Sequence, residues 1–288
     1  MRIAAFLVAA ACLPALAADP KPVTATPTSK APAPAQSGAQ QAPSQAQPEA
    51  DALPPPPPKI AIPDGPAVSK QELEGGLIIE DIKIGEGYEV KPGGAVVALY
   101  HGTLKESGKE FDSAFRRGEP VAFPLSGVIE GWQKGVPGMK IGGIRKLTVP
   151  AKMGYGERGA GASIPPNSDL VFIIQLEDAL QVIDEKPGTG EEATNQAVAV
   201  TTYEIKDNEG KVVSKADSSN PYIWVPNELM AMTYGLEGMK VGGRRKIIVP
   251  KQMCKTNPQS QITLPADQGV TIEFDLLGVR NFGPKKGK

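Results

Sequence analysis

The sequence predicts an α+β protein of two tandem domains that follow a Pro- and Ala-rich tether. The main observation is a repeat: residues 138–150 recur as residues 238–250, and nine of the thirteen positions are identical. A period of one hundred residues suits a whole small domain rather than a solenoid unit. Short β-like runs separated by turn residues recur in each copy, and the first copy has one short helical segment. A sheet with one helix on a face is an α+β design.

The N-terminus resembles a secretory signal peptide. Arg2 precedes an apolar run over residues 3–11, and small residues end in an A-x-A site at residues 15–17. The run is too short to span a bilayer. We therefore expect residues 1–17 to be removed and the protein to be periplasmic or secreted. A lipoprotein cut before Cys12 is the alternative, but the third residue before Cys12 is Ala rather than a large aliphatic residue.

Residues 18–68 are rich in Pro, Ala and Gln and contain no aromatic residue. Such a segment cannot bury enough apolar surface to offset the entropy lost on ordering. We expect a disordered linker with stiff polyproline stretches.

The first domain is expected over residues 69–182, with strands at residues 77–82, 95–100, 144–149 and 170–176. Residues 128–135 favour a short helix that places Ile129 and Trp132 on one side and ends at a glycine. The second domain is expected over residues 183–282, from a strand at 197–203 to one at 272–276. Residues 283–288 form a basic tail.

Composition excludes several function classes. The formal net charge is -1, with 31 basic and 32 acidic residues that form no basic block, which argues against nucleic acid as a partner. His101 is the only histidine, so no multi-histidine metal site can form, and we expect no metal and no cofactor. Signatures of serine nucleophiles, nucleotide loops and thiol redox pairs are missing. No later apolar run reaches membrane-spanning length. An enzyme of this composition would need little acid, base or metal chemistry.

Five separated motifs then identify a family resemblance. They are residues 100–104 (YHGTL), 108–113 (GKEFDS), 128–132 (VIEGW), 154–156 (GYG), and 164–167 (IPPN) with 170–172 (LVF). In this order they resemble the FKBP-type peptidyl-prolyl isomerases, the immunophilins that bind rapamycin. The resemblance implies a bent antiparallel sheet wrapped on a short helix in each domain, with a prolyl pocket between sheet and helix in the first. It also implies proline-containing polypeptides as clients and a rapamycin-like macrolide as a possible ligand.

The resemblance also assigns the site. It implies catalytic roles for Tyr100, Asp112, Trp132 and Tyr155, and substrate-binding roles for Phe111, Val128, Ile129, Ile164 and Phe172. Rotation about an X–Pro bond has a barrier of about 18–20 kcal/mol and breaks no covalent bond. The twisted amide is less polar than the planar one, so a dry aromatic pocket favours the transition state.

In the family, the Tyr155 hydroxyl and the Ile129 N–H would donate to substrate carbonyls, and Asp112 would meet Tyr100 at the rim. A plain hydrophobic core is the alternative for the aromatic residues, but a carboxylate at Asp112 is poor core material. Val121, Ala160 and Ser163 depart from the family pattern and put sequence preference and drug affinity in doubt.

The second domain is expected to have lost this pocket. Met232 replaces Trp132 and Lys255 replaces Tyr155, while Val213 and Ser214 stand for Phe111 and Asp112. Either Thr202 or Tyr203 matches Tyr100. We expect a degenerate domain without isomerase activity, serving as a client-docking surface or as a spacer. The function implied is a prolyl isomerase, or rotamase, that assists folding of envelope or secreted proteins. The alternative is a chaperone or binding module with incidental isomerase activity.

Overall fold

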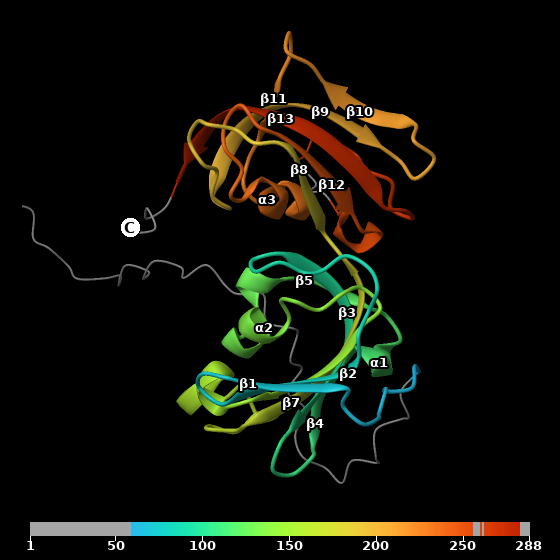
Figure 1. Cartoon of the computed structure of the whole chain (residues 1–288), viewed down its shortest axis with the longest axis vertical. Helices are drawn as coiled ribbons and strands as arrows, with labels where there is room; N and C mark the ends of the chain where they lie inside the picture. Colours follow the sequence, from blue (N-terminus) through green and yellow to red (C-terminus); the bar gives the residue numbers. More distant parts are fainter. Residues whose placement is uncertain (1–58, 256–259, 261, 283–288) are drawn as a thin grey trace, which may run out of the picture. The chain divides into compact units, whose positions relative to one another are not determined.

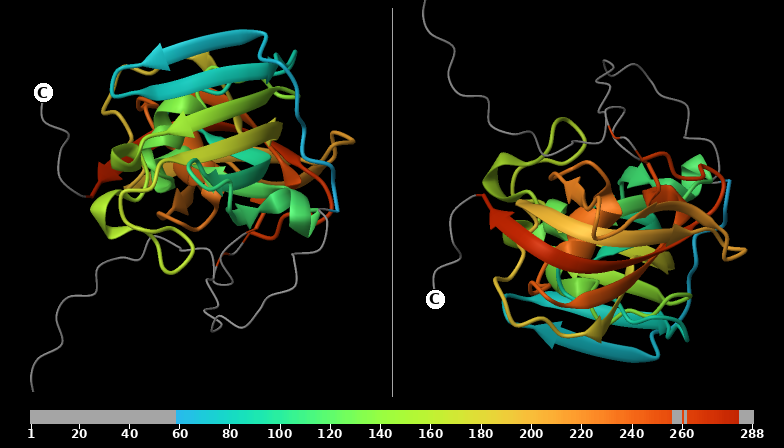
Figure 2. Two further views of the ribbon diagram at one scale, coloured as in Figure 1. Left: turned by 90° about the horizontal axis from the view of Figure 1, so that it is seen from below. Right: turned by 90° about the horizontal axis from the view of Figure 1, so that it is seen from above.

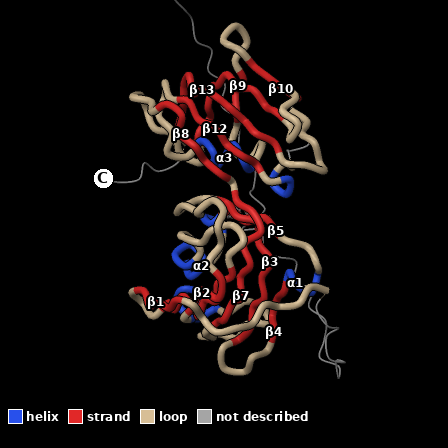
Figure 3. The backbone as a smooth tube through the Cα atoms, turned by 45° about the vertical axis from the view of Figure 1, so that its right-hand side comes forward, coloured by secondary structure: helices blue, strands red, loops and turns tan. Residues whose placement is uncertain are grey.

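The computed structural model describes residues 59–255, 260 and 262–282. The expected signal peptide, most of the linker and the basic tail lie outside the described residues. Strands dominate the described part of the chain and helices are few and short (Figure 3). The strands form two separate antiparallel sheets.

The first sheet has the strand order β1-β2-β6-β7-β3-β4, with β5 also paired to β3. The strands are β1 (Ser69–Leu73), β2 (Leu77–Lys83), β3 (Ala95–Leu104), β4 (Glu110–Ser113), β5 (Val121–Pro124), β6 (Ile144–Val149) and β7 (Leu170–Ala179). Figure 2 shows β1, β2, β6 and β7 side by side in its left view. The four predicted strands are confirmed. The short strands β1, β4 and β5 were not predicted, because four or five residues give too little alternation to read.

Ordered structure starts earlier than predicted. The Ile60 N–H donates to the Phe115 carbonyl at 3.2 Å, and the Val68 N–H donates to the Asp81 carbonyl at 2.7 Å. Ile62 packs against the core of the first sheet. The expectation that the disordered linker extends to residue 68 is therefore wrong for residues 59–68. Two backbone hydrogen bonds and the Ile62 side chain therefore join this segment to the first sheet and its core.

The predicted helix of the first domain is α2 (Glu130–Gly135), and a second short helix, α1 (Ala114–Arg117), follows β4. Ile129 precedes α2 as its N-cap residue, so the prediction that it lies on the helix is wrong. Helix α2 lies against one face of the first sheet (Figure 1). A Cβ atom at Gly131 would lie 2.4 Å from Val149, and one at Gly135 would lie 2.8 Å from Leu147. Both glycines therefore allow the helix to approach β6 closely.

The second sheet has the order β10-β9-β13-β12-β8, with β11 also paired to β9. Its elements are β8 (Gln181–Lys186), β9 (Ala197–Lys206), β10 (Val212–Ala216), β11 (Tyr222–Trp224), helix α3 (Met230–Leu236), β12 (Arg244–Val249) and β13 (Val270–Asn281). The right view of Figure 2 shows β10, β9 and β13 side by side. The order repeats that of the first sheet, strand for strand, except that the described residues contain no counterpart of β1. The expected boundary after Val182 falls inside β8.

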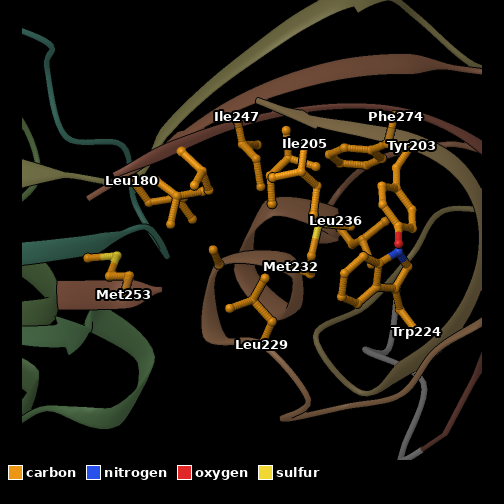
Figure 4. Close-up of a cluster of buried hydrophobic side chains, with 14 of the residues drawn as sticks. Leu180, Tyr203, Ile205, Trp224, Leu229, Met232, Leu236, Ile247, Met253 and Phe274 are labelled. Atoms are coloured by element: carbon orange, nitrogen blue, oxygen red, sulfur yellow. The ribbon is translucent and has the colours of Figure 1, made fainter. Parts of the chain in front are cut away.

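An apolar core lies between each sheet and the helix packed on it. Over residues 170–176 of β7 and 270–276 of β13 every second residue is buried, as expected for strands with one face on a core. In the second sheet the core gathers Ile205, Ile247 and Phe274 from strands with Met232 and Leu236 from α3 (Figure 4).

The repeated motif ties each helix to its sheet through a buried arginine. Arg145 is 8% exposed and donates to the Gly135 carbonyl at 2.8 Å and to Asp81 at 2.6 Å. Arg245 is 5% exposed and donates to the Gly235 carbonyl at 2.7 Å and to Asp184 at 2.7 Å. In each sheet the guanidinium satisfies a carbonyl near the helix C-terminus, which the helix itself leaves unpaired.

Candidate active site

The predicted aromatic residues meet where α2 packs on the first sheet. Trp132 is 4% exposed, and its ring makes edge-to-face contacts with Tyr100 at 5.7 Å, Phe123 at 5.6 Å and Phe172 at 5.4 Å between centroids. Phe111 stacks edge-on against Phe172 at 5.6 Å. These distances lie in the favourable range for aromatic pairs. We call these five residues, together with Asp112 and Tyr155, the aromatic site. Phe123 is its one aromatic member that the sequence did not predict.

Gly102 makes room for the two phenylalanine rings. It pairs with Asp112 of β4 on one side and with Phe172 of β7 on the other. A Cβ atom here would lie 2.6 Å from the Phe111 Cζ atom and 3.1 Å from the Phe172 ring. The glycine of the YHGTL motif is therefore required by the close approach of these rings.

At the edge of the aromatic site, Tyr100, Asp112 and Arg117 are joined by hydrogen bonds. The Tyr100 hydroxyl donates a short hydrogen bond to Asp112, and Arg117 donates to both Asp112 and the Tyr100 oxygen, the latter at 2.9 Å. Burial, followed by the hydrogen bond and charge of Asp112, raises the pKa of Tyr100 far above its usual value, so the phenol stays protonated. Arg117 also lies over the Tyr100 ring, 5.6 Å from its centroid. The predicted meeting of Asp112 and Tyr100 is present in the structure.

Sequence reasoning missed Arg117. It stands at the C-terminus of α1, five residues after Asp112, and its charge offsets that of the carboxylate. The pattern of an acidic residue followed by a helix ending in two arginines was the available signal.

Two donors predicted to contact substrate are free of internal partners. Tyr155 is 40% exposed, and burial of its ring and the charge of Asp112 raise the pKa of its hydroxyl. Within the described part of the chain, neither the Tyr155 hydroxyl nor the Ile129 N–H donates a hydrogen bond to another residue. Both groups are therefore available to an outside acceptor.

The remaining predicted residues flank the site. Val128 and Ile129 are half-buried just before α2, and both pack against the apolar core. Ile164 is 5% exposed and forms a bridge with Ala160. His101 lies apart, with its Nδ1 atom 3.2 Å from Glu110, and burial lowers its pKa. His101 is not part of the aromatic site.

Strand register resolves the correspondence with the second sheet. Tyr100 pairs with Ile174, which pairs with Arg145, and Tyr203 pairs with Phe274, which pairs with Arg245. Because the two arginines share one position of the repeat, Tyr203 rather than Thr202 is the counterpart of Tyr100.

The same register places Ser214 at the position of Asp112, as predicted, and Trp224 and Tyr222 at those of Phe123 and Val121. The Tyr203 hydroxyl lies 2.9 Å from the Ser214 hydroxyl. The second sheet thus keeps aromatic residues at the positions of Tyr100 and Phe123 and has an additional one, Tyr222, at the position of Val121. Figure 4 shows Tyr203 and Trp224 next to each other, and Tyr222 completes an aromatic trio.

The other substitutions in the second copy follow from packing. Met232 of α3 is buried and replaces Trp132, and Lys255 is exposed after a 3-10 turn, as Tyr155 is in the first copy. Ile205, fully buried, holds the register position of Gly102. The second copy thus has no room for a counterpart of the Phe111–Phe172 pair.

An antiparallel sheet packed on a short helix, with an aromatic site bordered by one carboxylate, defines a peptidyl-prolyl isomerase of the immunophilin class. A family profile described as "FKBP-type peptidyl-prolyl cis-trans isomerase" matches residues 87–177, all in the first domain. A "Probable FK506-binding protein" of Corynebacterium glutamicum is 48% identical over 118 residues, covering 41% of this chain and 94% of that protein. The chain belongs to the FKBP family and is a peptidyl-prolyl cis-trans isomerase.

Two further comparisons concern one relative. The "FKBP-type peptidyl-prolyl cis-trans isomerase FkpA" of Escherichia coli is 42% identical over 124 residues, covering 42% of this chain and 45% of that protein. The crystal structure of FkpA from Escherichia coli has 43% sequence identity and a TM-score of 0.36, and covers 38% of this chain and 51% of that chain.

No helix of the described residues is both long enough and apolar enough to cross a membrane. The described residues also contain no group of three or more His, Cys, Asp or Glu side chains placed to hold a metal ion.

Proposed function

We propose that the aromatic site of the first domain catalyses prolyl isomerisation in envelope or secreted client proteins. The observation that carries the proposal is the pairing of a buried aromatic floor at Trp132 with two free donors, the Tyr155 hydroxyl and the Ile129 N–H. The proline ring would contact Trp132, and the substrate carbonyls would accept from the two donors.

Rate enhancement in this proposal comes from differential solvation. The planar amide has a large dipole that water stabilises, and the twisted amide has a smaller one. Transfer to an aromatic environment therefore costs the ground state more than the transition state. Each ~1.4 kcal/mol of this difference gives about a tenfold rate increase.

The hydrogen bonds among Tyr100, Asp112 and Arg117 hold the edge of the aromatic site in position. Arg117 and Tyr100 both donate to Asp112, so the carboxylate is neutralised and fixed beside the aromatic rings. A fixed, compensated carboxylate orients the substrate without adding a free charge to the apolar surface.

The remaining proposals concern organisation and compartment. We propose tandem FKBP-like domains at residues 69–182 and 183–282, supported by the shared strand order and by the two buried arginines. A cleaved signal over residues 1–17 and a periplasmic or secreted location are supported by the N-terminal sequence. A rapamycin-like macrolide would compete with substrate, with an affinity changed by Val121 and Ala160.

A protease-free exchange assay on an apolar-X-Pro peptide tests the proposal with the full chain. Tyr155→Phe removes one donor worth about 0.5–1.5 kcal/mol, so the rate should fall about two- to tenfold with unchanged stability. Asp112→Asn should also lower the rate, whereas Asp64→Asn, an exposed acid away from the site, should not. A folded chain that exchanges the peptide no faster than buffer would refute the proposal.

A further inference from the structure

The second domain contains a pocket whose chemistry differs from that of the aromatic site. Its volume is about 510 Å³, and its lining includes Tyr203, Tyr222, Glu228, Lys215, Ile223 and Val225. It lies along β9, where β10 and β11 pair with that strand. The sequence predicted that the prolyl pocket has been lost from this domain, and the pocket present here has a different lining.

A buried carboxylate forms part of the pocket wall. Glu228 is 6% exposed and accepts hydrogen bonds from the Tyr222 hydroxyl, from the Ser260 hydroxyl at 2.8 Å and from the Val225 N–H at 3.4 Å. Burial, followed by the hydrogen bond to Glu228, raises the pKa of Tyr222 to about 12, so the phenol remains a donor at neutral pH.

Among the ion pairs of the described residues, none involves the Glu228 carboxylate. Hydrogen bonds compensate part of the cost of burying a carboxylate, and an incoming cation would compensate more. The pocket is thus electrostatically matched to a positive group.

Two aromatic rings, those of Tyr203 and Tyr222, line the same pocket. Tyr203 and Tyr222 meet edge to face at 5.7 Å between centroids, and Tyr222 lies 4.8 Å from Trp224. A ring face attracts an ammonium or guanidinium group within about 6 Å of its centroid. Aromatic rings beside a carboxylate therefore suit the methylene chain and the charged head of a lysine or arginine.

The rim of the pocket is apolar and exposed. Ile223 is 57% exposed and Val225 is 50% exposed, and both line the opening. Lys215, the cation of the wall, interacts electrostatically with Glu204 and Asp217, which offset its charge. A polypeptide could place apolar residues on the rim on either side of an inserted basic side chain.

We propose that the second domain binds extended polypeptide clients by inserting a lysine or arginine side chain beside Glu228, against the rings of Tyr203 and Tyr222. This is a recognition site for a basic residue flanked by apolar ones. It is distinct from the prolyl site, and its occupation needs no proline.

The test uses the full chain and a fluorescent peptide with one lysine among apolar residues and no proline, so that the aromatic site of the first domain is not engaged. Fluorescence anisotropy should show saturable binding. The same peptide with acetylated lysine should bind at least tenfold more weakly. Equal affinity for both peptides, or no binding, would overturn the proposal, and neither result requires a variant that folds.

Variants then locate the site. Glu228→Gln should weaken binding of the lysine peptide at least tenfold, while Glu209→Gln, the same change at an exposed turn of the second domain, should leave it unchanged. Both variants should isomerise the proline peptide at the rate of the original chain, which separates this proposal from the first. Undiminished lysine-peptide binding by a folded Glu228→Gln chain would also contradict the proposal.

Discussion

Gly102 and Ile205 hold the same register position in the two sheets, and they decide which aromatic residues each sheet can hold. The glycine admits the Phe111 and Phe172 rings, and the isoleucine fills the equivalent space with its own side chain. One position thus separates a domain with a phenylalanine pair from one whose aromatic residues gather on β9 and β11.

The first prediction concerns this glycine. In Gly102→Ala, the new methyl group must displace the tip of the Phe111 ring, which is half-buried and able to move. Stability should fall by at most about 1–3 kcal/mol, the usual cost of overpacking. Isomerase activity should fall about tenfold or more, because the ring geometry changes.

Peptide exchange and thermal melting measure the two effects. The matched control is Gly65→Ala, where the added atom meets only an ordinary contact at 3.5 Å. Full activity in Gly102→Ala would show that the Phe111 position is unimportant for the reaction.

We expect Trp132 to contribute to the stability of the fold as well as to the isomerase rate. Its ring contacts three other aromatic rings and is 4% exposed, so Trp132→Ala should cost about 3–5 kcal/mol of stability. Trp132→Phe should retain most of that stability and still lower the isomerase rate. Chemical denaturation together with the exchange assay separates the two roles, and an unaltered rate in a folded Trp132→Phe chain would exclude a contact with substrate.

The two buried arginines should differ in their contribution to stability. Arg145→Ala removes the counterion of Asp81, whose side chain is 17% exposed and keeps only the Ser69 hydroxyl as a side-chain donor, and it leaves two carbonyls without a donor. This should cost about 3–5 kcal/mol. Arg245→Ala should cost less, because Asp184 is 60% exposed and water can solvate it. Denaturant unfolding of the two variants measures the order, and the reverse order would contradict this account.

A pH dependence follows from Tyr222. Its pKa in the folded protein is about 12, above the ordinary value of 10.0, so the protonated phenol stabilises the fold fully below about pH 10. That contribution is lost as the pH rises from 10 toward 12. The stability difference between the original chain and Tyr222→Phe should therefore shrink between pH 8 and pH 11, as melting temperatures would show. A constant difference would mean that Tyr222 ionises at its ordinary pH.

The sequence predicted the main strands and the short helix, because alternation and residue spacing are local signals. The meeting of Tyr100 with Asp112 was implied by the family resemblance and not by local pattern. The sequence could not predict the register between β9 and β13, on which the identity of the Tyr100 counterpart depends. Comparing the copies at fixed spacing from the repeated motif located Met232 and Lys255 correctly. The sequence did not indicate that Tyr222 and Glu228 lie near Tyr203. Tyr222 comes close to it only when β11 pairs with β9, and Glu228 lies between β11 and α3.

The sequence wrongly predicted disorder for residues 59–68 for a related reason. Composition averaged over residues 18–68 carries no signal for the last ten of them. Ile62 packs on the core of the first sheet, and the Ile60 and Val68 N–H groups donate to the Phe115 and Asp81 carbonyls, which lie far away in the sequence.

The two buried arginines, Arg145 and Arg245, affect which residues of each copy can be substituted without loss of the fold. The most similar stretch of the chain holds each helix on its sheet, and it contributes neither the phenylalanine pair of one copy nor the carboxylate pocket of the other. Framework and recognition surface are therefore encoded in separate segments of each domain. Substitutions in β4, β5, β10 and β11 can alter what a domain binds while the helix stays anchored, so a third specificity could be introduced by changing these short strands alone.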